Sequence, residues 1–128
     1  MKNIVRTVRG DISPFDLGKT YCHEHLIIDS KLIAVEFPHI HLHSVANAVD
    51  ELSDCKQGGL SALFDAMPFS SGSQVEKLFE ISTLADIHIV VATGLHHDRY
   101  YGDLHWSNRV SVDTLTELFV ADVTIGID

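Results

Sequence analysis

Residues 20–29, Thr-Tyr-Cys-His-Glu-His-Leu-Ile-Ile-Asp, place two histidines two positions apart within an apolar run. A run of this composition favours a β-strand. Side chains at positions i and i+2 of a strand point to the same face, so His23 and His25 can direct both imidazoles toward one point. Neutral imidazole is the commonest metal ligand in proteins. The stretch therefore predicts a strand that carries part of a metal site.

Two further strands are predicted downstream of this one. Residues 60–67 and 87–93 are apolar, and Pro68 and Gly94 follow them. Nearly continuous apolar runs are typical of parallel strands that are covered on both faces. Upstream, residues 3–8 predict a short strand and residues 10–14 a turn. The stretch from residue 30 to residue 43 is expected to be irregular.

Three helices are predicted between and after these strands. Ser44 is a candidate N-cap for a helix that extends to Gln57. Ser73 and Glu76 fit a capping box that opens a second helix, and Ser111 precedes a third. Their inward faces are expected to carry Val45, Ala48, Val49, Leu52 and Cys55 in the first, Val75, Leu78, Phe79 and Ser82 in the second, and Val112, Leu115, Phe119 and Val123 in the third.

This order of strands and helices predicts an α/β fold with a parallel sheet and right-handed crossovers. The chain has 128 residues, a length that suits one domain. We expect a single domain over residues 1–128. Residues 1–19 would form an N-terminal hairpin, and residues 20–128 would form three strand–helix units.

Composition and charge argue against several kinds of partner. The chain has 9 Lys and Arg against 18 Asp and Glu, a formal net charge of −9, which disfavours nucleic acid and anionic membranes. No apolar run reaches the about 18–20 residues of a membrane span. The N-terminus lacks the apolar segment of a signal peptide, so we predict a cytoplasmic location. Cys22 and Cys55 are expected to be buried, reduced thiols.

The motif Gly18–Leu26 resembles the first strand of the phosphotriesterase-like group in the amidohydrolase superfamily. The resemblance implies the N-terminal part of a (β/α)8 TIM-type barrel, about three strand–helix units after a short hairpin. Gly72-Ser73-Gln74 stands where the family usually has Gly-Arg-Asp. Other stretches similar to the group are Thr7–Gly10, Asp16–Gly18, Phe64–Pro68, Glu80–Ser82 and Asp86–Gly94.

The resemblance also implies a chemistry. His23 and His25 match two ligands of a binuclear metal centre, most often two Zn, with Mn, Fe or Co as alternatives. Metal-bound hydroxide would attack a small-molecule phosphotriester, lactone or carboxylester. The family's other ligands are a carboxylated lysine, two histidines and an aspartate on later strands. We therefore expect hydrolysis only when the barrel is complete. A homo-oligomer is an open alternative to a monomer.

Loops that follow barrel strands carry specificity. Relatives often place an aromatic pocket residue two positions after the glycine of the third strand, which matches His96. We predict substrate contact by His96 or by its neighbours His97, Arg99 and Tyr100. Asp65, near the end of the second strand, is expected either to support the metal ligands or to be a purely structural carboxylate.

Other functions stay open at this stage. His39, His41 and His43 repeat the i, i+2 spacing but follow Pro38, which favours a solvated loop over a metal site. One alternative function is a truncated, catalytically inactive α/β binding or interaction module, which would have to cover its exposed sheet edge by association. Another is a non-enzymatic metal-binding fragment that uses these three histidines.

Overall fold

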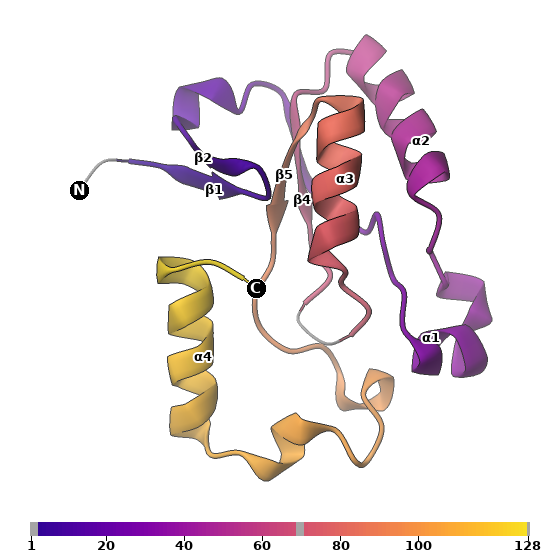
Figure 1. The fold of residues 1–128 in the computed structure, drawn as a ribbon, viewed down its shortest axis with the longest axis vertical. Coiled ribbons are helices and arrows are strands. Elements are labelled where there is room, and N and C mark those ends of the chain that lie inside the picture. Colours follow the sequence, from indigo (N-terminus) through magenta and orange to yellow (C-terminus); the bar gives the residue numbers. More distant parts are fainter. Residues whose placement is uncertain (1–2, 69–70, 128) are drawn as a thin grey trace.

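The computed structural model describes residues 3–68 and 71–127 (Figure 1), so residues 1 and 128, the ends of the predicted domain, lie outside this range. The chain begins with an antiparallel hairpin of β1 (Val5–Thr7) and β2 (Gly10–Ile12). The turn predicted at residues 10–14 is therefore wrong for its first three residues, because they pair with β1. A 3-10 turn, η1 (Pro14–Asp16), follows the hairpin.

Three parallel strands form the main sheet, in the order β3 (Thr20–Glu24), β4 (Ala62–Asp65) and β5 (His88–Val91). This confirms the predicted parallel sheet. The hairpin attaches beside β5, where the Val8 N–H donates to the Ile89 carbonyl at 2.9 Å. β3 ends at Glu24, earlier than the expected residue 27. Its pairing register with β4 shifts before Glu24. The N–H groups of His25 and Leu26 then donate to the side-chain carboxylates of Glu24 and Asp65.

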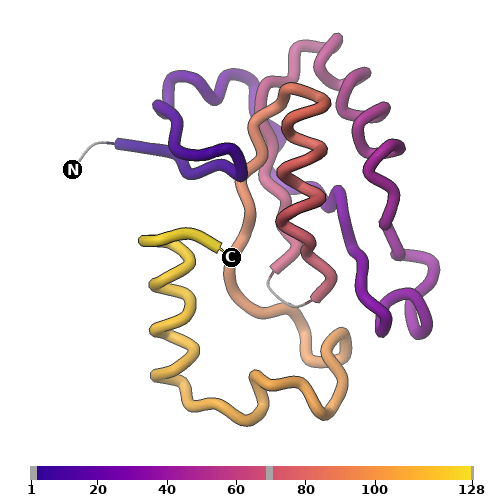
Figure 2. Tube along the Cα trace, viewed as in Figure 1, coloured from indigo at the N-terminus to yellow at the C-terminus, as the bar shows by residue number. Residues whose placement is uncertain are grey.

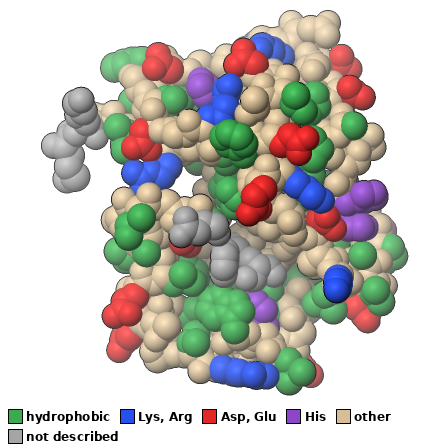
Figure 3. Space-filling model, viewed as in Figure 1, with side chains coloured by type: hydrophobic (Ala, Val, Ile, Leu, Met, Phe, Trp, Pro, Cys, Tyr) green, Lys and Arg blue, Asp and Glu red, His purple; other side chains and the backbone are tan. Residues whose placement is uncertain are grey.

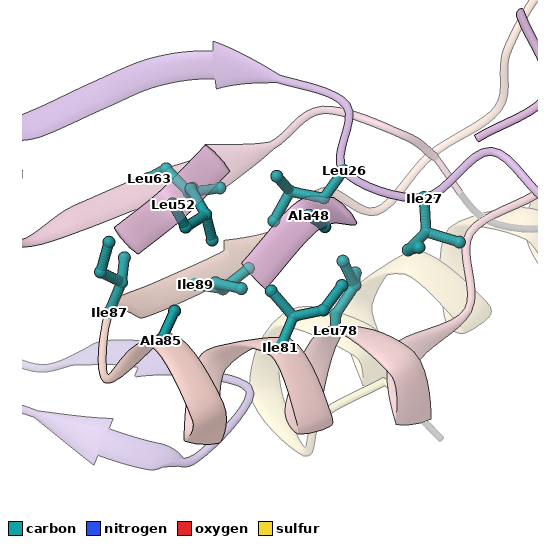
Figure 4. Packing of buried hydrophobic residues seen from close by; sticks show 10 residues of the cluster. All are labelled: Leu26, Ile27, Ala48, Leu52, Leu63, Leu78, Ile81, Ala85, Ile87 and Ile89. Atoms are coloured by element: carbon teal, nitrogen blue, oxygen red, sulfur yellow. The ribbon is translucent and has the colours of Figure 1, made fainter. Parts of the chain in front are cut away.

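Helices α2 (Val45–Gln57) and α3 (Val75–Ala85) pack side by side. The side chain of Ser44 accepts a hydrogen bond from the Asn47 N–H at 3.2 Å, which confirms the predicted cap of α2. Apolar side chains of both helices point toward those of the strands (Figure 4). Burial of such surface is worth about 25 cal/mol per Å². The main core consists of Leu26, Ile27, Ala48, Leu52, Leu63, Leu78, Ile81, Ala85, Ile87 and Ile89.

Some side chains expected in the core are exposed. Cys22 lies on the outer strand β3 and Cys55 near the end of α2, and both are exposed, so the prediction of buried thiols is wrong. Phe79 of α3 is 51% exposed. The buried face of α3 instead consists of Leu78, Ile81, Ser82 and Ala85.

The capping box predicted for α3 is also absent. The helix is capped by Gln74, without a side-chain bond to its first turn. The hydroxyl oxygen of Ser73 is buried and has no partner among the described residues. The Gln74 side chain donates to the Asp29 carbonyl at 2.8 Å. The start of α3 is therefore held by a contact with the loop after β3.

The segment expected to be irregular contains a short helix, α1 (Lys31–Glu36), and a 3-10 turn, η2 (Pro38–Ile40). The Ser30 side chain caps α1 by accepting from the Ile33 N–H at 3.2 Å. Ile33 is 1% exposed and packs in a second apolar cluster with Ile28 and Met67. The cap and this buried side chain explain why the segment becomes helical.

The last helix, α4 (Val112–Thr124), is capped by Ser111, whose hydroxyl accepts from the Thr114 N–H at 3.1 Å. The predicted start is thus confirmed. The predicted inward face is wrong, because Val112 and Val123 are 78% and 67% exposed. α4 stands apart from α3 (Figure 2). Its C-terminal end contacts the rest of the chain, where the Arg6 side chain donates to the Val123 carbonyl at 3.2 Å.

Within residues 3–68 and 71–127, no helix has both the length and the apolar character needed to cross a bilayer. On the face drawn in Figure 3, carboxylates are spread over several elements and are interspersed with lysines and arginines.

Candidate functional site

The two histidines of the first motif lie side by side where β3 ends. Their ring centroids are 5.2 Å apart and the ring planes meet at 86°. Metal–nitrogen bonds of about 2.0–2.1 Å at tetrahedral angles place two imidazole centroids about 5 Å apart. The spacing of His23 and His25 therefore fits two ligands of one metal ion.

One ring nitrogen of His25 has no hydrogen-bond partner among the described residues. Its Nδ1 atom is buried and accepts or donates no hydrogen bond within the described part of the chain. Buried polar atoms are normally paired, and leaving one unpaired costs about 1–3 kcal/mol. A ligand at this position would remove that cost. The imidazole thus has the chemistry and the free atom that a metal or a polar substrate needs.

The described residues do not by themselves form a metal centre. Within them, no group of three or more His, Cys, Asp or Glu side chains is arranged to hold an ion. Catalytic zinc usually has three protein ligands and a water molecule. His23 and His25 fit as two ligands of a site that needs further donors.

A pocket of about 180 Å³ lies next to His25. It is formed by the loop after β3, by α1 and η2, and by the loops after β4 and β5. Its wall is mainly apolar, and its polar groups are two imidazoles, one phenol and one hydroxyl. The lining residues are His25, Ile28, Ile33, Ile40, Met67, Ser71, His96 and Tyr100.

The loop after β5 brings His96 and Tyr100 to this pocket. Their rings meet edge to face, with centroids 4.6 Å apart, and Tyr100 also packs on Phe37 at 5.0 Å. His96 is an exposed residue, but partial desolvation of its ring lowers the pKa of His96, and the nearby charges of His25, His97 and Arg99 lower it further. His96 is therefore mostly neutral at pH 7. Its Nδ1 accepts from the His97 N–H at 2.7 Å, so its Nε2–H is the hydrogen-bond donor that the ring presents.

The other two predicted substrate residues lie outside the pocket wall. His97 is exposed and pairs with Asp98, with 2.7 Å between His97 Nδ1 and Asp98 Oδ1. The guanidinium of Arg99 lies over the Tyr100 ring, 4.6 Å from its centroid, and donates to the Tyr100 hydroxyl. Arg99 thus contacts both the ring and the hydroxyl of Tyr100 and holds this side chain in place. Contact of any of these residues with substrate stays a prediction.

Asp65 is fully buried at the end of β4. Its two carboxylate oxygens accept from the N–H groups of Leu26, at 3.0 Å, and Met67, at 2.9 Å. Burial raises the pKa of Asp65, whereas these two hydrogen bonds and the charge of His25 act in the opposite direction. Asp65 therefore holds the backbone on either side of the pocket. It supports His25 through the backbone of the next residue.

The three histidines at 39, 41 and 43 do not converge on one point. His41 contacts Asp29, with 2.8 Å between Nε2 and Oδ1, and His43 stacks on His41 with centroids 4.6 Å apart. His39 is exposed within η2. These contacts argue against a metal-binding fragment built on the three side chains.

The pocket also contains residues that sequence reasoning missed. Ile33 and Ile40 come from the segment that was expected to be irregular, so their place in the wall was not predicted. The available signal was Ser30, a good N-cap residue directly before Lys31-Leu32-Ile33.

Comparisons with known proteins identify a family and several relatives of this chain. A model described as the phosphotriesterase family matches residues 3–128. The phospho-furanose lactonase of Mycoplasmopsis agalactiae is 30% identical in an alignment of 127 residues, gaps included, which covers 97% of this chain and 36% of the lactonase. The aryldialkylphosphatase of Saccharolobus solfataricus is 28% identical in an alignment of 123 residues, gaps included, which covers 93% of this chain and 38% of that enzyme.

A solved structure gives the same result for the fold. The crystal structure of an amidohydrolase from Mycoplasma synoviae has a TM-score of 0.88 and 26% identity, and the match covers 99% of this chain and 37% of that one. The chain therefore spans less than two fifths of the length of these relatives. Its hairpin and three strand–helix units match part of the longer chain of that amidohydrolase, which confirms the expectation of a partial barrel.

Proposed function

The chain belongs to the phosphotriesterase family, and on that premise we propose that it is the N-terminal part of a metal-dependent hydrolase of ester-type bonds. The proposal treats residues 1–128 as a single incomplete barrel domain. The observation that carries it is the pair His23 and His25 at the end of β3, with an unpartnered nitrogen of His25 beside a pocket. Relatives named as a lactonase and a phosphatase support the reaction class.

His23 and His25 would hold one divalent ion, and zinc is the metal that we expect, with two ions in the complete centre. When bound, such a metal lowers the pKa of water and polarises the scissile carbonyl or phosphoryl bond. Asp65 holds the Leu26 N–H and so fixes the backbone next to His25. The remaining ligands would come from other parts of a complete barrel.

The pocket would bind the small-molecule substrate. Ile28, Ile33 and Met67 form an apolar wall that excludes water from part of the substrate. His96 is mostly neutral, and its Nε2–H would donate one hydrogen bond to a substrate oxygen, because its Nδ1 accepts from the His97 N–H. Tyr100, held by Arg99, closes the side of the pocket beside His96. A phosphotriester, a lactone and a carboxylester all fit this set of groups.

The test is a chimera in which this chain replaces the matching part of the Mycoplasmopsis agalactiae lactonase. We expect the chimera to retain metal and to hydrolyse the parent's lactone substrate. His23→Ala and His25→Ala should each lose metal, measured by elemental analysis, and turnover. The matched control is His39→Ala, which removes an exposed histidine outside the pocket.

Full activity and full metal content in either His23→Ala or His25→Ala would refute the proposal. A folded chimera that holds no metal would favour the alternative of an inactive α/β binding module. A homo-oligomeric state and a cytoplasmic location remain predictions of the sequence.

A further inference from the structure

Asp29, in the loop between β3 and α1, uses every polar atom that it has. Its N–H donates to the Gly72 carbonyl at 2.8 Å, and its own carbonyl accepts from the Gln74 side chain at 2.8 Å. One carboxylate oxygen lies 2.8 Å from His41 Nε2, and the other accepts from Lys77 Nζ at 2.5 Å. These partners come from the loop after β4, from α3 and from the loop before α2. Asp29 therefore joins three segments to the loop that follows the histidine pair.

Backbone contacts around Asp29 reinforce this junction. Ile28 and Leu42 exchange two hydrogen bonds, at 2.9 and 3.2 Å. Gly72 approaches so closely that a Cβ atom on it would lie 3.0 Å from the Asp29 nitrogen and 3.2 Å from the Ile28 carbonyl carbon. The loop after β3 thus has little room to move relative to the loop after β4.

The junction is connected to the candidate site through a short piece of backbone. Asp65 fixes the N–H of Leu26, and Asp29 fixes the segment three residues further on. His25 precedes this segment, and Ile28 within it lines the pocket. Asp29 itself is not part of the pocket wall. Two carboxylates therefore hold the two ends of the segment that carries the pocket wall next to His25.

We propose that Asp29 is a positioning residue, which sets the place of His25 and Ile28 by tying their loop to Lys77, His41 and Gly72. This inference rests on the proposed function, because it assigns a role to Asp29 in that same site. The carboxylate is not in the pocket wall, and its partners are His41 and Lys77 rather than His23 or His25, so its effect passes through the backbone of residues 25–29.

The experiment uses the 128-residue chain and two measurements. The first is amide hydrogen exchange at Leu26 and Ile28 by NMR without metal. The second is titration with Zn²⁺, followed through the ring signals of His23 and His25. Asp29→Ala should speed exchange at both amides at least tenfold and weaken zinc binding about tenfold, the size seen when supports of metal ligands are removed. Asp29→Asn keeps one acceptor and should restore a large part of both.

The control is Asp11→Asn, which removes an exposed ion pair with Arg6 in the hairpin, far from the loop. It should leave both measurements unchanged. If Asp29→Ala does not fold, Asp29→Asn and Lys77→Met give the same test with smaller losses. Unchanged exchange at Leu26 and Ile28 in Asp29→Ala, or in Lys77→Met where Asp29→Ala does not fold, would overturn the inference.

The two proposals fail in different ways. If zinc binding by the chain does not depend on His25, shown with His25→Ala, the metal site of the proposed function fails. The exchange measurement needs no metal, so it still decides whether Asp29 fixes the loop. Faster exchange with unchanged zinc affinity would overturn the positioning role and leave the proposed function intact.

Discussion

The carboxylate of Asp65 accepts a hydrogen bond from the Leu26 N–H at 3.0 Å, directly after His25. This contact replaces the strand pairing that β3 loses beyond Glu24. The other oxygen of Asp65 accepts from the Met67 N–H at 2.9 Å, so a single buried side chain holds the loops after β3 and β4. This buried carboxylate therefore links the two loops that flank the pocket.

Replacement of Asp65 by Ala should strongly destabilise the chain. It leaves two buried N–H groups without acceptors, each at a cost of about 1–3 kcal/mol. We expect the free energy of unfolding to fall by about 2–4 kcal/mol in urea denaturation. Asp103→Ala, which removes an exposed carboxylate in the loop after β5, serves as the control. A loss below about 0.5 kcal/mol, typical of surface substitutions, would contradict this prediction.

Replacement of Gly72 by Ala separates backbone strain from steric contact. Gly72 has φ = +112°, and an added Cβ would lie 3.0 Å from the Asp29 nitrogen. Gly94 has nearly the same φ, +111°, with nothing within 4 Å of the added atom. Both Ala variants carry strain of about 1–3 kcal/mol. Thermal unfolding should show a larger loss for Gly72→Ala, and equal losses would mean that the loop yields to the new methyl group.

The alternation of strands and helices could be predicted because apolar runs and helical stripes report burial directly. Ser44 and Ser111 also gave correct helix starts. Ser73 did not, because the Gln74 side chain bonds to Asp29 and the Ser73 hydroxyl faces the interior. A capping pattern in sequence carries no information about such a long-range partner.

The pocket shows the limits of sequence reasoning more clearly. α1 covers residues 31–36, too short for a helical stripe, and only Ile33 of it is buried. The meeting of His25 and His96 depends on how the ends of β3 and β5 are arranged, which local patterns do not contain. For α4 the stripe predicted an inward face, but nothing in residues 3–68 and 71–127 buries it. Periodicity identifies an apolar face and not its partner.

The two cysteines provide a direct chemical test of the fold. Cys22 and Cys55 are both exposed, so a thiol reagent should modify both in the native chain. The measurement is titration with Ellman's reagent, with and without denaturant. We expect the same number of reactive thiols and similar fast rates in both conditions. Reaction that requires denaturant would support the original expectation of buried thiols.

The ion pairs of Asp29 should make stability depend on acid pH. Hydrogen bonds from Lys77 and His41 lower the pKa of Asp29 from its ordinary 3.8. A lowered folded pKa gives stability that is present above pH 3.8 and lost as the pH falls through the folded value. The stability difference between the wild type and Asp29→Asn should therefore shrink below that pH. Urea denaturation at a series of pH values checks this, and a difference that stays constant would mean that the ion pairs contribute nothing.

His96 should titrate below the ordinary histidine value of 6.5. Burial in the loop after β5 is the main cause, and the charges of His25, His97 and Arg99 add to it. The measurement is an NMR titration of the His96 ring. His25→Ala removes one repelling charge and should move the midpoint upward, whereas His39→Ala, on the exposed turn η2, should leave it in place. Partial desolvation is the largest cause of the lowered pKa of His96. The rise of the pKa in His25→Ala should therefore be smaller than the total difference between the wild-type pKa and 6.5. A midpoint at or above 6.5 in the wild type would contradict the partial desolvation of the ring and argue against contact between His96 and the pocket wall.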